Sequence, residues 1–213
     1  MRLNGFSLVE LVIVLAVAGI LMALGMPSLK TMIDSTKTKA AAESILSGLR
    51  FAKSEAIKRN MPMRFQLVST LGSDCAFSTA SALWVVNQEE NRALERNPEG
   101  KCDLATLTPA DGDVLDPAEP YIAFKSDGKV YTGLTVDAVD VAAAGASIIT
   151  FSPLGQVISN LDGSATLTNI TVTSDNADAK TWSVRVTGTN GSIKFCDPDP
   201  AVLAAGSPLA CPL

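Results

Sequence analysis

The side chains that could do chemistry in this sequence are few, and the residue most often used for catalysis is missing. None of the 213 residues is a histidine. Imidazole is the usual general base of serine and cysteine hydrolases and a frequent zinc ligand. No other nucleophile and base are visible as a pair, which disfavours a membrane-anchored hydrolase. We therefore expect a protein that is not an enzyme and holds no cofactor.

Four cysteines, Cys75, Cys102, Cys196 and Cys211, lie in the later part of the chain. They lack the close Cys-x-x-Cys spacing of a zinc site, and no histidine is present to activate a thiol. In an oxidising compartment they would form two disulfides, for which three connectivities are possible. We favour Cys75 with Cys102 and Cys196 with Cys211, because each bridge then ties down one irregular loop. The second bridge would contribute about 3 kcal/mol in the chain-entropy model.

An acidic segment offers a weak candidate for a metal site. Asp111, Asp113 and Asp116 surround Gly112, and Glu119 follows. Oxygen ligands at alternate positions around a glycine suit Ca²⁺, but the spacing misses the full EF-hand pattern. We favour a solvated acidic loop and expect no metal.

One carboxylate, Glu10, borders the most apolar segment. The 19 residues from Leu11 to Leu29 carry no charge. As a helix they would be roughly 28 Å long, close to the thickness of a bilayer core. The segment exceeds the apolar region of a secretory signal peptide, so we favour a membrane-spanning helix. There Glu10 costs on the order of 1–3 kcal/mol unless it is paired. It could form a capping box with Ser7, or pair with a cation in an assembly of such helices.

The helical pattern continues into a polar region as far as Pro62. Apolar residues recur there at helical spacing, which predicts one rod over residues 6–60 whose second half docks on a globular body. This stripe consists of Ile33, Ala41, Ile45, Leu49, Ala52 and Ala56. A basic cluster near the helix end, interpreted as a solvated last turn, consists of Arg50, Lys53, Lys58 and Arg59.

Beyond Pro62 the period changes to that of β-strands, which predicts an α+β fold with an antiparallel body. Three dipeptides are hairpin signals: Asp127-Gly128, Asp162-Gly163 and Asn190-Gly191. Residues 87–120 are too polar for a regular core and are expected to form a long surface excursion. The first 60 residues hold 8 of the 17 basic and 4 of the 22 acidic residues, so the body carries a net charge of −9. Such a body should repel nucleic acid.

The segment MRLNG followed by FSLVELVIVLAVAGIL resembles the N-terminus of type IV pilins and type II secretion pseudopilins. This resemblance implies cleavage between Gly5 and Phe6 by an inner-membrane prepilin peptidase, with methylation of the new amino group on Phe6. It also implies that Glu10 pairs with the Phe6 amine of a neighbouring subunit during assembly. Pro27 matches the proline that loosens this helix in the family, and Ser7 stands where threonine is commoner.

Two further segments narrow the resemblance. The run AKSEAIKR at residues 52–59 and the run ITFSPLGQV at residues 149–157 are similar to the GspH/FimT group of minor pilins and pseudopilins. The chain would then divide into a leader (1–5), a transmembrane and filament-core half-helix (6–29), an amphipathic half-helix (30–60) and a periplasmic β-rich domain (61–213).

The function implied is that of a structural minor pilin of a type IV pilus that helps initiate or cap the filament. A GspH-type pseudopilin of a type II secretion system is the first alternative. A DNA-binding competence pilin is the second, disfavoured because Lys194 stands beside Asp197 and Asp199. The implied location is the inner membrane, crossed once, and then the fibre. The implied partners are membrane lipid, other pilin subunits, the prepilin peptidase and the inner-membrane assembly platform.

Overall fold

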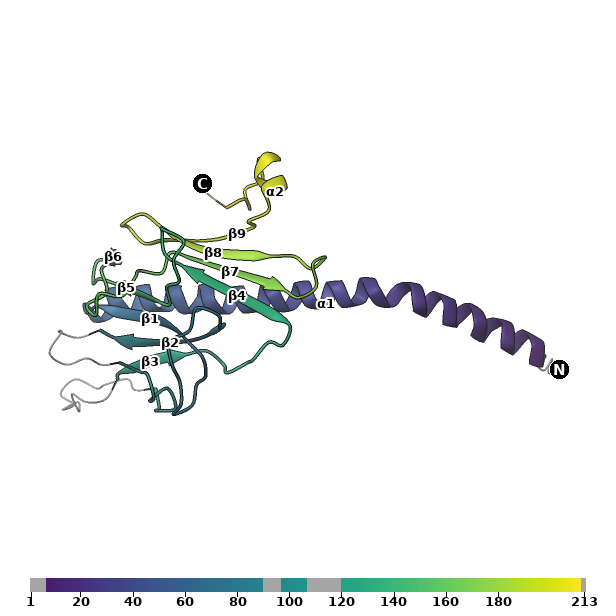
Figure 1. Cartoon of the computed structure of the whole chain (residues 1–213), viewed down its shortest axis with the longest axis horizontal. Helices are drawn as coiled ribbons and strands as arrows, with labels where there is room; N and C mark the ends of the chain where they lie inside the picture. The colour runs from purple at the N-terminus through teal and green to yellow at the C-terminus, as the bar shows by residue number, and fades with distance from the viewer. Residues whose placement is uncertain (1–6, 90–96, 107–119, 212–213) are drawn as a thin grey trace.

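A long helix and two antiparallel sheets make up the protein. The computed structural model describes residues 7–89, 97–106 and 120–211, and within the helix it leaves the side chains of residues 23–27 undescribed. The sheets lie on two sides of the second half of the helix, and its first half projects away from them (Figure 1). The predicted α+β architecture is therefore confirmed.

Helix α1 runs unbroken over Leu8–Arg59. It begins after Ser7 and ends at Asn60, whose left-handed backbone (φ 52°) turns its N–H back to the carbonyls of Ala56 and Ile57. Asparagine tolerates this conformation better than most residues do, which makes it a suitable helix terminator. The predicted rod thus ends where expected.

The first sheet has five strands in the order β3-β2-β1-β5-β6, with every neighbouring pair antiparallel. Its strands are β1 (Met63–Val68), β2 (Leu83–Gln88), β3 (Ile122–Lys125), β5 (Ile148–Phe151) and β6 (Val157–Ile158). All six residues of β1 are buried, because α1 covers one face of this sheet and loops cover the other.

The second sheet has four strands in the order β4-β7-β8-β9, again all antiparallel. Its strands are β4 (Leu134–Val139), β7 (Asn169–Ser174), β8 (Trp182–Thr187) and β9 (Ser192–Cys196). A short helix, α2 (Pro200–Ala204), follows in the C-terminal tail. Alternation in β7 buries Ile170 and Val172, as the sequence pattern predicts.

The main core lies where α1 packs against both sheets. Trp84 and Phe65 from the first sheet and Trp182 from the second belong to it. The helix contributes a buried stripe of Ala41, Ala42, Ile45, Leu46, Leu49, Ala52 and Ala56. Ile33, predicted to belong to this stripe, is 48% exposed, because the face that meets the body at this level is formed by Asp34 and Thr38 instead.

Only one of the three predicted hairpins exists. Asn190-Gly191 lies in the turn between β8 and β9. Gly128 and Gly163 both adopt a left-handed backbone, with φ of 75° and 76°, but the strands before and after each pair belong to different sheets. A turn signal reports local backbone geometry and carries no information on which strands will pair.

A second apolar cluster lies on the outer face of the first sheet. It comprises Val68, Cys75, Leu83, Val85, Cys102 and Ile122. The prediction that residues 87–120 form a surface excursion is wrong at its start and at Cys102. Asn87 and Gln88 are buried in β2, and Cys102 is fully buried in this cluster. The acidic residues Asp111, Asp113 and Asp116 lie outside the described residues.

Candidate assembly surface

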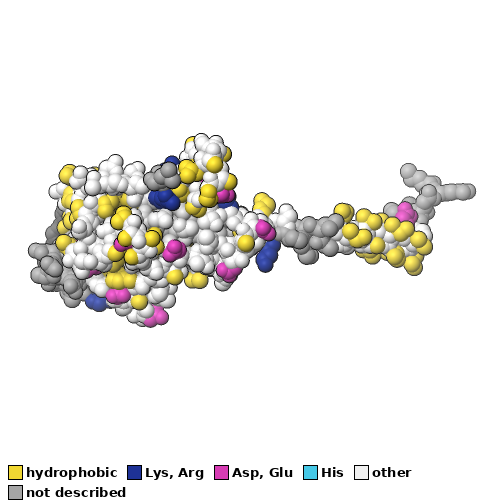
Figure 2. All heavy atoms as spheres, turned by 45° about the horizontal axis from the view of Figure 1, so that its top comes forward, with side chains coloured by type: hydrophobic (Ala, Val, Ile, Leu, Met, Phe, Trp, Pro, Cys, Tyr) yellow, Lys and Arg dark blue, Asp and Glu magenta, His cyan; other side chains and the backbone are white. Residues whose placement is uncertain are grey.

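The first half of α1 is an apolar arm without a covering layer in the described chain. We define the N-terminal arm as residues 8–29. Leu8 is 78% exposed and Leu21 64%, and residues 11–15 are each more than half exposed, so over residues 8–22 the arm presents apolar side chains on all sides. Figure 2 shows hydrophobic side chains gathered over this part of the molecule. Exposed apolar surface of this extent marks an interaction site.

Glu10 interrupts this apolar surface in the first turn of α1. Its side chain is exposed, and it has no hydrogen-bond or ion-pair partner among the residues that the structure describes. Ser7 is the N-cap residue, but its side chain makes no capping hydrogen bond. The capping-box interpretation of Glu10 is therefore not supported, and the carboxylate remains available to a partner.

Two other predicted site residues, Gly5 and Phe6, lie outside the described part of the chain. Pro27 lies inside α1 and does not end it. Over the residues described, no helix offers a stretch both long enough and apolar enough to span a bilayer.

Where the arm leaves the body, the β7–β8 loop holds α1 by polar contacts. We call these contacts the helix clamp. The Ser35 hydroxyl accepts a hydrogen bond from the backbone N–H of Lys180 (3.0 Å), and the Thr38 hydroxyl donates to the carbonyl oxygen of Lys180 (2.7 Å). Asn176 donates to Asp34 (3.4 Å). A hydrogen bond from Lys37 holds the pKa of Asp34 below its ordinary value. The clamp therefore fixes the position at which α1 leaves the body.

Near the C-terminal end of α1, three residues of the basic cluster make specific contacts. The interpretation of this cluster as a solvated last turn is therefore incomplete. Arg59 Nε lies 2.6 Å from the buried Glu55 carboxylate, and Lys58 lies 3.3 Å from it. Lys53 reaches across to the β8–β9 turn, where its ammonium donates to the carbonyl oxygens of Asn190 and Gly191. Sequence periodicity did not predict these contacts, because they depend on where the turn packs.

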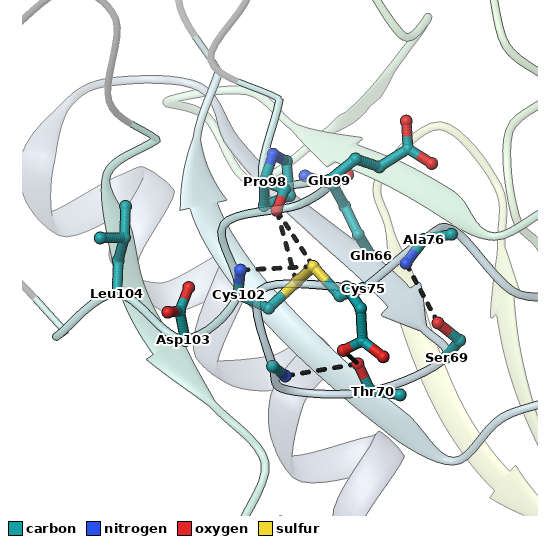
Figure 3. The surroundings of a disulfide bond; sticks show 12 residues. Gln66, Ser69, Thr70, Cys75, Ala76, Pro98, Glu99, Cys102, Asp103 and Leu104 are labelled. Atoms are coloured by element: carbon teal, nitrogen blue, oxygen red, sulfur yellow. Dashed lines mark hydrogen bonds between the residues drawn. A yellow bond between two sulfur atoms is a disulfide. The ribbon is translucent and has the colours of Figure 1, made fainter.

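Two disulfides secure the loops of the body. Cys75 is bonded to Cys102, and Cys196 to Cys211. These are the pairs favoured from the sequence. Figure 3 shows the first bridge beside Pro98 and Gln66, over the outer face of the first sheet. In addition, Lys125 donates to the carbonyl oxygen of Cys102 (3.0 Å).

A cluster of charged side chains, largely buried, lies at the end of the first sheet. Arg64 lies 2.5 Å from Glu89 and 3.2 Å from Asp162, and Glu89 also accepts from the N–H of Leu161 (2.9 Å). Burial acts to raise the pKa of Asp162, but hydrogen bonds from Ser164 and the charge of Arg64 lower it overall. These contacts join β1, the end of β2 and the β6–β7 loop. The cluster is an ion-pair network and contains no side chain that would act as a nucleophile.

No group of three or more Cys, Asp or Glu residues in the described ranges could hold a metal ion. Lys194, the basic residue weighed for DNA binding, donates to the carbonyl oxygen of Ala210 (3.0 Å). Lys180 nearby is paired with Asp197 (2.9 Å).

Two family models match this chain, one at its N-terminus and one from the second half of α1 into the body. Residues 1–26 match the family model of the prokaryotic N-terminal methylation motif, and residues 41–140 match that of the type II transport protein GspH. No curated protein matches the chain. Two crystal forms of the type IV minor pilin FimU of Pseudomonas aeruginosa are similar in structure, each with 16% identity and a TM-score of 0.42. They cover 83% and 82% of this chain, and 96% and 99% of their own.

Proposed function

Because this chain is a GspH/FimT-like member of the type IV pilin and pseudopilin family, we propose that it assembles into a fibre through its N-terminal arm. Members of this family are structural subunits rather than enzymes. The observation that carries the proposal is the arm itself, whose described side chains are apolar on every side and whose one carboxylate, Glu10, has no partner among the described residues.

The driving force for assembly would be the packing of arms from neighbouring subunits. Fully burying one aliphatic side chain from water contributes about 1.5–3 kcal/mol. If the arm first resides in lipid, its apolar side chains are already removed from water, so their burial in the fibre gives no further gain. Helix packing and polar pairing must then favour the fibre. A pairing group within the arm is then decisive.

We assign that pairing role to Glu10. Cleavage between Gly5 and Phe6 would create a positively charged, methylated amine at Phe6, near the start of the arm. The Glu10 carboxylate of one subunit would accept this amine from the next, which neutralises both charges in an apolar setting. One fixed ion pair for each contact also sets the stagger between subunits.

The same proposal divides the chain as the sequence suggests. Residues 1–5 are the leader, 6–29 anchor the subunit in the inner membrane and later form the filament core, and 30–60 dock on the body. Residues 61–213 form the periplasmic domain, where the two disulfides would be oxidised. The prepilin peptidase and the inner-membrane assembly platform are the partners needed for processing and extraction.

Within the family we favour a minor pilin of a type IV pilus that helps initiate or cap the filament. The two disulfide-tied loops support this choice, because they would stabilise a body exposed outside the cell. A GspH-type subunit of a secretion pseudopilus is the alternative. Loss of the gene should reduce the number of pili in the first case, and protein secretion in the second.

Mass spectrometry of the protein isolated from its own cells tests the processing step. We expect a mass that lacks residues 1–5 and carries one additional methyl group. A chain that still begins at Met1 in cells with active prepilin peptidase would count against the proposal.

A substitution at Glu10 tests the assembly step. Glu10→Gln removes the charge with little change in shape, so we expect much less of the subunit in the sheared fibre fraction and a body that is still folded. Glu43→Gln is the matched control, because Glu43 is exposed on the same helix. Equal incorporation of both variants would show that Glu10 has no pairing role.

A further inference from the structure

The turn between β8 and β9 contains an asparagine followed by glycine in an unusual setting. Asn190 is exposed, whereas Gly191 is buried and adopts a left-handed backbone (φ 60°). In such a sequence the backbone nitrogen of the glycine can attack the side-chain amide carbon of the asparagine, because glycine has no side chain to obstruct the approach. The contacts around Asn190 determine whether the fold assists this reaction.

The first contact stabilises the oxygen that gains charge. The backbone N–H of Ser192 donates to Oδ1 of Asn190 (3.3 Å). Attack on the side-chain carbon places negative charge on this oxygen. A backbone N–H already directed at it acts as an oxyanion donor.

The second contact activates the attacking nitrogen. Lys53 Nζ lies 2.9 Å from the backbone carbonyl oxygen of Asn190 and 2.8 Å from that of Gly191. The Asn190 carbonyl shares its peptide bond with the nitrogen of Gly191. A cation on that carbonyl stabilises the negative charge that spreads over the peptide group when the nitrogen loses its proton.

We propose that Asn190–Gly191 is a built-in modification site, at which the native fold converts asparagine to an acidic residue through a cyclic imide. The Gly191 nitrogen forms a bond to Cγ of Asn190, the bond from Cγ to Nδ2 breaks, and ammonia leaves with the proton lost by the nitrogen. Water then opens the ring at one of its two carbonyls. Lys53 acts as a positioning and activating residue, and water is the co-reactant.

The packing of the turn controls the rate and the product. The N–H of Gly191 donates to the carbonyl oxygen of Gly188 (3.2 Å), and this bond must open before the nitrogen can attack. A Cβ on Gly191 would lie 2.9 Å from the carbonyl oxygen of Gly155 and 3.1 Å from Phe151, so the turn has no spare room. Isoaspartate would lengthen the backbone by one methylene group here. The fold therefore favours opening to aspartate, which keeps the length of the backbone unchanged.

The sequence supplies a clean assay. Trypsin cleaves after Arg185 and Lys194, which releases a peptide of residues 186–194 with Asn190 as its single asparagine. We would incubate the folded full-length protein at neutral pH, digest it briefly at mildly acidic pH and follow the gain of about 1 Da on this peptide. The other Asn-Gly pair of the sequence, Asn4-Gly5, falls in a different tryptic peptide and does not interfere.

The decisive comparison is between two variants of Lys53. Lys53→Met should slow the conversion in the folded protein roughly three- to tenfold, the effect of losing one charge-assisted hydrogen bond. Lys53→Arg should retain most of the rate. In urea, where the turn is absent, all three proteins should convert at the same rate.

Two results would overturn the proposal. One is a folded protein that shows no conversion during the time in which the urea-unfolded chain converts fully. The other is a Lys53→Met protein that converts as fast as the parent while its melting temperature shows that it is folded. Conversion that depends on Lys53 only in the folded state supports the proposal.

Discussion

Single charged residues of α1 hold the helix to itself and to the body, and Glu55 is the clearest example. Its side chain is 8% exposed and bound by Arg59 and Lys58. Burial acts to raise its pKa, but the hydrogen bonds from Arg59 and Lys58 outweigh this effect and lower the pKa below its ordinary value of 4.5. The ionised carboxylate therefore stabilises the folded state.

Glu55→Gln should lower the free energy of unfolding by about 1–2 kcal/mol at pH 7, because it removes a buried charge from two basic partners. Since the folded-state pKa lies below the unfolded value, this stability is present above about pH 4.5 and is lost as the pH falls through the folded-state pKa. Denaturant unfolding of both proteins from pH 7 to pH 3 should show the difference shrinking with acidity.

The control is Glu43→Gln, on a pair 3.7 Å apart in which both side chains are 53% exposed. Exposed pairs of this kind contribute little to stability. A Glu43 variant as unstable as the Glu55 variant would contradict the assignment.

Among the elements, α1 depends on how closely it approaches the first sheet. Gly48 marks this approach, because a Cβ there would lie 2.7 Å from Phe65 and 2.7 Å from Trp84. A glycine inside a helix weakens it by roughly 1 kcal/mol relative to alanine. Here the absence of a side chain is required by the aromatic rings that pack on the helix.

Gly48→Ala should therefore reduce stability by about 1–3 kcal/mol despite the better helix propensity of alanine, because Phe65 and Trp84 must move. Thermal unfolding of the body measures this change. Gly19→Ala serves as the control, since a Cβ at Gly19 meets nothing within 4 Å. If Gly48→Ala raised the melting temperature, the close approach would be wrong.

The two disulfides should differ in what their loss exposes. Cys75 and Cys102 belong to the second apolar cluster, whereas the tail closed by Cys196 and Cys211 includes α2, which has no buried residue. The loops span 27 and 15 residues, so each bridge contributes about 3–4 kcal/mol in the chain-entropy model. The two bridges therefore contribute similar amounts to the free energy of unfolding, but they hold different parts of the structure.

Replacing both cysteines of each pair by alanine should separate the two roles. Loss of the Cys75 bridge should lower global stability and increase binding of a hydrophobic dye, because Val68, Val85 and Ile122 lose their cover. Loss of the Cys196 bridge should chiefly make the tail sensitive to limited proteolysis. Identical dye binding and identical cleavage patterns for the two variants would refute this distinction.

Sequence patterns predicted the elements better than their arrangement. The limits of α1 and the alternation in β7 followed from helical spacing and from side-chain period. The division into two sheets did not follow, because Asp127-Gly128 and Asp162-Gly163 each connect strands of different sheets. Ile33 fits the apolar stripe by spacing, yet it lies beside the clamp rather than against the core. Such features depend on contacts between residues far apart in the sequence.

At the scale of the whole molecule, the arm and the body share no hydrophobic core among the described side chains. The hydrophobic core on α1 begins at Ala41, and no described side chain of the arm belongs to it. The arm was predictable from its uncharged sequence and the position of Glu10. The clamp at its base was not, because Ser35 and Thr38 meet Lys180, which lies more than 140 positions away.

A fragment of residues 30–213 should therefore fold with both disulfides and remain monomeric, while the full chain associates or requires detergent. Sedimentation and thermal unfolding of the two proteins test this expectation. A fragment that unfolds far below the full chain would show that the arm stabilises the body.

The unbroken course of α1 through both arm and body has a mechanical consequence. A pull on the arm travels along the helix axis, parallel to the surface where the buried stripe meets the sheets, so the contacts resist as a set under shear instead of peeling open one after another. The clamp lies where the pulling force first reaches the body, and the C-terminal tail lies away from the helix axis along which that force acts. Tension on a fibre of such subunits would thus leave the surface loops undistorted until the rod itself slid out.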